Sequence, residues 1–171
     1  MSILTTLRRL PDRRPRLSLV LAVIAVELVG ASGAVFTARG LTPWYGTLQR
    51  PALAPPNWVF GPVWTVLFAL MGIAVWLVWR RLHGSAADRR ARVALAVFAI
   101  HFVANLAWSA AFFGLQSVDL GLAVILVLLA LILLTIRAFA WVDRRAALLL
   151  VPYLLWVCFA AYLNYRFWVL N

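Results

Sequence analysis

The chain has 171 residues, of which 65% are hydrophobic and 12% are charged, whereas about 25% of the residues of an average soluble domain are charged. Its positive charge comes from arginine alone, and the arginines separate long apolar segments instead of forming one basic patch. The composition therefore excludes a soluble domain, argues against nucleic acid as a partner, and predicts an integral membrane protein in a lipid bilayer.

Five apolar segments are long enough to cross a bilayer as helices. A helix rises about 1.5 Å per residue, so about 17 to 25 apolar residues cross the hydrocarbon core, and a helix satisfies its own backbone there. We therefore predict an all-α fold: a single membrane domain over residues 1–171, a bundle of five transmembrane helices with antiparallel neighbours. The segments are 17–36, 58–79, 93–115, 120–136, whose helix we expect to continue to 141, and 147–169.

The arginines predict the orientation of the bundle. Thirteen of the sixteen precede span one, join spans two and three, or follow span four, and the other three lie on the opposite side. Because cytoplasmic loops are enriched in Arg and Lys, we expect the N-terminus in the cytoplasm and the C-terminus outside. The absence of lysine favours a bacterial chain, and hence a bacterial cell membrane. A cleaved signal peptide is the alternative for span one, but its apolar run is too long.

The first connection, residues 37–57, is longer than the others and contains four prolines together with Trp44 and Tyr45. Stiff loops with their own aromatic side chains are often lids, so we expect this segment to cover a site. The alternative is that Trp44 and Tyr45 belong to an aromatic belt at the membrane interface.

Span three carries a polar stripe of His101, Asn105 and Ser109, spaced four residues apart, with Trp108 beside it. Lipid offers such groups no partners, so the stripe must face protein or a wet cavity. Hydrogen bonds that hold helices together and a lined ligand pocket are equally good interpretations.

The same helix has pairs of small residues at four-residue spacing, Ala107 with Ala111 and Ala110 with Gly114. Such pairs let helix backbones approach closely. They predict a homodimer through helix three, with packing against a neighbouring helix of the same chain as the alternative.

Spans two and five each present an aromatic face. If these faces converge on the stripe of span three, they enclose an aromatic pocket with a few polar groups, the usual form of a ligand site. Plain core packing is the alternative. The residues are Trp64, Phe68 and Met71 in span two, and Tyr153, Trp156, Ala160 and Asn164 in span five.

Cys158 is the only cysteine, and the chain has two histidines. A disulfide within the chain is therefore excluded, and we expect no metal site. The sequence also offers no nucleophile or acid/base pair that would support catalysis in the dark.

Four separated motifs, in order, resemble the TspO/MBR family of tryptophan-rich sensory proteins and mitochondrial translocator proteins. They are WY at 44–45 with LQRP at 48–51, PPNWVFGPVWT at 55–65, NLAWS with FFG within 105–114, and PYLLW with LNY within 152–165. Leu53 and Ala54 depart from an aromatic and a polar residue that are common in the family, His101 from Gln, and Ala110 from Pro. The resemblance therefore implies a thinner lid and a changed ligand preference.

The resemblance implies a five-helix membrane bundle, frequently dimeric, whose pocket on the loop-one side binds porphyrins and synthetic aromatic ligands. By position, the family's pocket residues carry over to Tyr45, Trp64, Asn105, Ser109, Trp156 and Ala160. With the faces described above, the candidate ligand-binding residues are Tyr45, Trp64, Phe68, His101, Asn105, Trp108, Ser109, Tyr153, Trp156 and Ala160.

Three functions follow as hypotheses. The pocket and the resemblance favour a tetrapyrrole-binding membrane sensor that regulates porphyrin metabolism or stress responses, with protoporphyrin IX or a related porphyrin as ligand and no required cofactor. The first alternative is an enzyme that degrades porphyrin in light, with Trp64 and Trp156 facing each other across the macrocycle as oxidisable groups. The second is a transporter of porphyrins or other lipophilic ligands, against which the absence of an inverted repeat counts.

Overall fold

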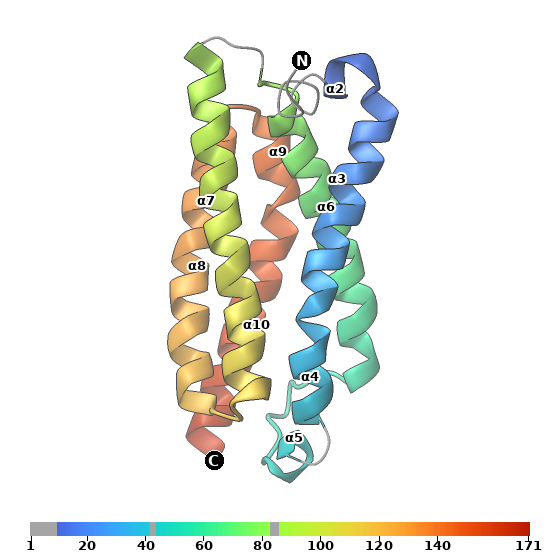
Figure 1. Ribbon diagram of the computed structural model, residues 1–171. Helices are drawn as coiled ribbons and strands as arrows, with labels where there is room; N and C mark the ends of the chain where they lie inside the picture. Colours follow the sequence, from blue (N-terminus) through green and yellow to red (C-terminus); the bar gives the residue numbers. More distant parts are fainter. Residues whose placement is uncertain (1–9, 42–43, 83–85) are drawn as a thin grey trace.

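The computed structural model describes residues 10–41, 44–82 and 86–171 and forms a bundle of helices. Its described part contains five helical segments long and apolar enough to cross a membrane, which confirms the predicted all-α membrane bundle. In Figure 1, the paired helices of spans one and two run along one side of the bundle, and those of spans three and four along the other.

The elements divide among the five spans as follows. Span one is α3 (Pro15–Ser32) with α4 (Ala34–Leu41), preceded by the short α2 (Leu10–Arg13), and span two is η1 (Asn57–Val59) with α6 (Phe60–Trp79). Span three is α7 (Ala86–Ser109) with the π-helical turn η2 (Ala110–Gly114), and span four is α8 (Val118–Ala140). Span five is α9 (Arg144–Leu149) with α10 (Val151–Leu170), and α5 (Trp44–Thr47) lies in the first connection.

Local sequence explains where these helices begin. Pro15 occupies the first turn of α3, where its missing N–H costs nothing. Ser117 accepts a hydrogen bond from the Leu120 amide at the start of α8, and Asp143 accepts one from the Arg145 amide at the start of α9. Burial opposes ionisation of Asp143, but its hydrogen bonds with Arg81 and the Arg145 amide hold the carboxyl pKa below its usual value.

The helix of span one extends beyond its predicted end. It continues through α4 to Leu41, so the predicted lid over 37–57 begins with a helical turn. The helix of span four passes Arg137 and ends at Ala140, close to the expected end at 141. The Arg137 guanidinium lies over the Trp141 ring at 4.8 Å, so the charge rests against an aromatic surface at the helix end.

The small residues of span three pack within the chain at their C-terminal end. Ala111 is buried, and a Cβ on Gly114 would lie 3.1 Å from the Phe36 ring. Gly114 therefore lets the end of span one pack closely on η2, as the intramolecular alternative expected, and Ala111 lies in the interior. Ala110 is half-buried and Ala107 is exposed, so Ala107 is the more accessible of these two to a second subunit.

The two ends of the bundle differ in charge. The connections 80–82 and 141–143, flanked by arginines, lie at the end where α3 begins, whereas α5 and the C-terminus lie at the opposite end (Figure 1). Arg8 and Arg9, which belong to the predicted cytoplasmic set, lie outside the described residues.

We predict that the arginine-rich end is cytoplasmic. A C-terminal alkaline phosphatase fusion, which is active only outside the cytoplasm, should give high activity, and a C-terminal green fluorescent protein fusion should give little fluorescence. The opposite pair of signals would contradict the predicted orientation.

Candidate ligand-binding site

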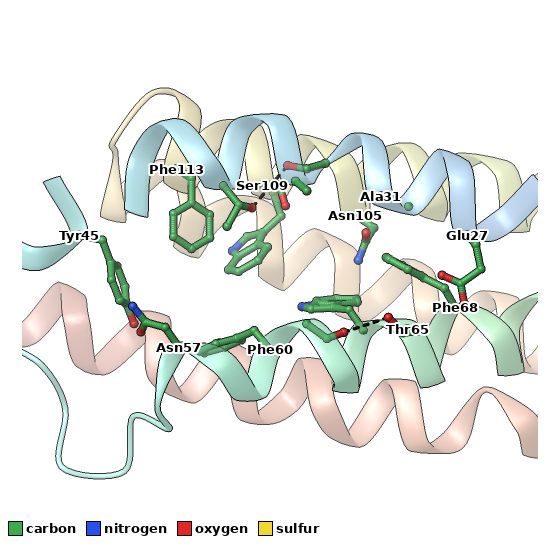
Figure 2. Close-up of a pocket in the computed structure, with 17 residues that line it drawn as sticks. Glu27, Ala31, Tyr45, Asn57, Phe60, Thr65, Phe68, Asn105, Ser109 and Phe113 are labelled. Carbon is green, nitrogen blue, oxygen red and sulfur yellow. Dashed lines mark hydrogen bonds between the residues drawn. The ribbon is translucent and has the colours of Figure 1, made fainter. Parts of the chain in front are cut away.

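A cavity of about 400 Å³ lies between spans one, two and three at the end of the bundle that carries α5. Figure 2 shows the side chains of these spans converging on it, with Tyr45 and Glu27 at its two ends. The residues that line it are Glu27, Gly30, Ala31, Gly33, Ala34, Thr37, Tyr45, Asn57, Phe60, Gly61, Trp64, Thr65, Phe68, Asn105, Trp108, Ser109 and Phe113.

The cavity exists because α3 and α6 meet closely at one level and separate toward α5. A Cβ on Gly72 would lie 2.6 Å from the Val23 Cα, so only glycine lets the two backbones touch there. Further along, a Cβ on Gly30 would lie 2.4 Å from the Phe68 ring. Phe68 therefore fills the narrow part of the space between the helices, and the cavity opens beyond it.

Aromatic rings form the wall on span two. The rings of Trp64 and Phe68 lie 5.1 Å apart and are tilted by 31°, so they present a nearly continuous apolar surface. The Trp64 ring also meets Tyr153 edge-on at 6.2 Å, which supports it from behind. A flat ligand could stack against this wall.

Polar groups lie on the opposite wall, on span three. The Asn105 side-chain amide donates to the Tyr153 hydroxyl at 3.0 Å, which fixes the orientation of an amide that lines the cavity. The Trp108 indole N–H is turned away from the cavity and donates to Asn164 at 3.1 Å. Asn164 in turn donates to the Val118 carbonyl, so this network ties α7, α8 and α10 together. Asn105 and Ser109 therefore sit on a rigid frame.

The first connection closes the end of the cavity. Tyr45 is 5% exposed, and its ring packs on Phe112, Phe113 and Phe167. The Arg50 guanidinium lies 5.6 Å from the Tyr45 ring centroid. Burial raises the pKa of Tyr45 above its usual value, although Arg50 partly opposes this, so the hydroxyl remains a hydrogen-bond donor at neutral pH.

Further hydrogen bonds hold this connection in place. Arg50 donates to the Pro55 carbonyl at 3.0 Å and to Asn57 at 3.2 Å. The Asn171 side chain accepts from the Gln49 amide at 2.8 Å and donates to the Gln49 carbonyl at 3.3 Å. The segment is therefore packed over the cavity, an arrangement that fits the predicted lid better than a loose interfacial loop.

Six of the ten predicted site residues line the cavity and four do not. The six are Tyr45, Trp64, Phe68, Asn105, Trp108 and Ser109. The four are His101, Tyr153, Trp156 and Ala160.

His101 and Tyr153 belong to the packed interior. His101 is fully buried and turns toward span four, where its Nδ1 lies 3.3 Å from the Thr135 hydroxyl. Tyr153 is also fully buried, and its hydroxyl holds Asn105. Of the two interpretations left open for the stripe, hydrogen bonding between helices describes His101 and cavity lining describes Ser109. Both describe Asn105, which lines the cavity and donates to Tyr153 of α10.

The sequence had indicated that Trp156 stands opposite Trp64 across the cavity. In the structure, Trp156 does not lie there. It packs against Phe60 at 6.0 Å and Phe159 at 5.6 Å, and Ala160 packs against the core beside it. Trp156 is rotated by roughly 60° around the helix from Tyr153, and its ring packs beside the cavity instead of lining it. The wall opposite Trp64 is made by span three instead.

Glu27 is a site residue that the sequence analysis missed. It lies in the middle of span one and lines the cavity. A lone carboxyl group inside an apolar span was the available signal, because ionisable residues at that depth mark functional sites.

Among the described residues, no group of three His, Cys, Asp or Glu side chains is arranged to hold a metal ion. The cavity therefore offers apolar surface, amide and hydroxyl groups and one carboxyl group, which is a set suited to binding an organic ligand.

Comparison with known proteins places these features in a family. Residues 22–169 match the TspO/MBR family. The chain is 43% identical to the tryptophan-rich protein TspO of Chlorobaculum tepidum over 159 residues, which cover 91% of this chain and 96% of that protein. It is 36% identical to the tryptophan-rich sensory protein of Cereibacter sphaeroides over 149 residues, covering 85% and 90%. It is 38% identical to the human translocator protein over 125 residues, covering 73% of each chain.

Proposed function

The chain belongs to the TspO/MBR family, and on that premise we propose that it is a membrane receptor whose cavity binds a tetrapyrrole and reports its presence. The relatives named sensory protein and translocator protein support a membrane sensor or receptor role in the family. The ligand class is inferred from the cavity of this chain.

The observation that carries the proposal is the pairing of an aromatic wall with a polar one. Trp64 and Phe68 offer a flat apolar surface, and Asn105 and Ser109 face the same space from span three. A ligand that suits both walls is flat, largely apolar and polar at one edge. A porphyrin has that form, and a cavity of about 400 Å³ lies within the range of about 300 to 1,000 Å³ seen for ligand pockets.

Direct titration tests this proposal. We expect protoporphyrin IX, added in the dark to the protein in phosphatidylcholine nanodiscs, to quench tryptophan fluorescence and shift the porphyrin absorption band with one saturable site. Empty nanodiscs control for partition into lipid. Binding that rises linearly with porphyrin and equals the empty-disc signal would overturn the proposal.

Light-dependent breakdown of the bound porphyrin is a second candidate function. Two indoles, those of Trp64 and Trp108, line the cavity and would lie beside an excited porphyrin. Replacing Trp64 with phenylalanine should keep part of the binding and slow porphyrin loss under light. Porphyrin that binds to the parent protein and stays intact under light would rule this function out.

We also propose that the receptor forms a homodimer through the outer face of α7. Ala107 lies on that face, one turn after Val103 and two turns after Ile100, which are 66% and 59% exposed. Replacing Ala107 with phenylalanine should shift the detergent-purified protein toward monomer in light scattering, because the bulky ring separates the backbones. The matched control is Val103→Leu, which keeps an aliphatic side chain there. An unchanged dimer in the Ala107 variant would exclude this face.

A further inference from the structure

Glu27 is the only charged residue among those that line the cavity in the described part of the chain. It lies near the middle of the span Pro15–Ala38, and Figure 2 shows its side chain beside Phe68, at the end of the cavity far from Tyr45. The carboxyl group therefore defines the deep end of the site.

The described part of the bundle supplies no counter-charge for this carboxyl group. Arg16 and Arg39, which flank Glu27 on span one, lie about 11 or 12 residues from it along the sequence, which amounts to roughly 15 Å of helix or more. The other arginines precede, follow or join the other spans or lie near their ends. The structure records neither an ion pair nor a hydrogen bond from its side chain to another described residue. In Figure 2 its side chain lies beside the ring of Phe68, and the small residue Ala31 lies one turn further along the same helix. The hydrogen-bonding capacity of Glu27 is therefore available to a ligand.

A carboxylate at membrane depth is costly unless a cation or hydrogen-bond donor meets it. Such a group is kept without a partner in the protein only where something else satisfies it. A ligand with a protonated amine would remove the cost and gain a charge-assisted hydrogen bond. A ligand with a carboxylate in the same position would be repelled.

The opposite end of the site carries the opposite charge. Arg50 contacts two residues of the cavity wall, stacking over Tyr45 and donating to Asn57. The cavity thus has a cation behind its α5 end and a carboxyl group at its deep end. An elongated ligand with unlike ends has one preferred direction in such a field.

We propose that Glu27 is the specificity-determining residue of the cavity. It selects flat apolar ligands that carry a protonated amine at one end, and it turns the carboxylates of an anionic ligand toward Arg50. This inference rests on the proposed function only because both concern the same cavity. It applies to any flat ligand that enters the cavity, whether or not that ligand is a tetrapyrrole.

Two probes with opposite charge test it: quinacrine, a flat acridine with a protonated alkylamine, and protoporphyrin IX, which carries two carboxylates. Glu27→Gln keeps the size of the side chain and removes the charge. We expect this variant to bind quinacrine about tenfold more weakly than the parent protein, and to bind protoporphyrin IX equally or more tightly. The matched control is Asp119→Asn, which removes one negative charge outside the cavity and keeps a hydrogen-bond acceptor for Trp168.

A comparison within the parent protein keeps the test decisive if the variant does not fold. Quinacrine should bind at least about tenfold more tightly than 9-chloroacridine, a neutral acridine without the amine, after subtraction of binding to empty phosphatidylcholine nanodiscs. Equal affinities for the two acridines, or equal quinacrine affinity for the parent and the folded Glu27→Gln variant, would overturn the role of Glu27. Porphyrin binding that persists in that event leaves the receptor proposal standing. If quinacrine binding depends on Glu27 and porphyrin does not bind at all, the proposed role of Glu27 is supported and the tetrapyrrole is rejected as the ligand. An absence of binding by every probe would reject both.

Discussion

Replacing Gly72 with alanine is expected to lower the thermal stability of the protein markedly, and replacing it with leucine to prevent folding. The added Cβ would lie 2.6 Å from the Cα of Val23, a backbone atom that moves only if α3 as a whole moves. Overpacking of this kind costs about 1 to 3 kcal/mol for small additions and more for larger ones. The loss should be visible as a lower melting temperature in detergent, measured by tryptophan fluorescence or light scattering.

Gly61 offers the matched control for this substitution. It lies in the first turn of α6, the same helix, and a Cβ there would meet nothing within 4 Å. Gly61→Ala should therefore leave the melting temperature within a few degrees of the parent. Equal melting temperatures for the alanine variants at 61 and 72 would contradict the close contact between α3 and α6.

Replacing Trp64 with alanine is expected to weaken porphyrin binding by roughly 30-fold. The indole supplies most of the flat surface on span two, and an aromatic pair contributes about 0.5 to 1.5 kcal/mol beyond the burial of apolar area. A total loss of about 2 kcal/mol corresponds to that factor in the dissociation constant. Titration of the variant with protoporphyrin IX in the dark measures it.

Trp156→Ala is the control that separates two arrangements of the site. The indole of Trp156 does not line the cavity itself; it packs on Phe159 and on Phe60, which does line the cavity. Its loss should therefore change the porphyrin dissociation constant less than about threefold. If Trp156 instead proved as important as Trp64, the ligand would lie between spans two and five. The site assignment to spans one, two and three would then be wrong.

The sequence was sufficient to predict the spans and much of the cavity. Apolar length sets the spans, and the four-residue spacing of Asn105 and Ser109 placed both on one helical face. Tyr45 and Trp64 came from the resemblance to the family. The five spans are confirmed and these four residues line the cavity, because each inference depends on local spacing or on a motif that is contiguous in the chain.

The remaining features depend on contacts between distant segments, which spacing does not determine. The depth at which Gly72 meets Val23 fixes where α3 and α6 separate, and hence where the cavity begins. The rotation of span five, which places Tyr153 against Asn105, also places Trp156 against Phe60 and Phe159. The spacing of Ala111 fits a dimer motif, but Ala111 is buried within the chain. Spacing alone does not distinguish these two arrangements.

A structure of the protein with bound protoporphyrin IX tests the central claim most directly. The account predicts that the macrocycle lies against Trp64 and Phe68, with its polar edge within hydrogen-bond distance of Asn105 or Ser109 and its carboxylates toward Arg50. Density for the macrocycle on the outer surface of the bundle, or between spans two and five beside Trp156, would contradict it.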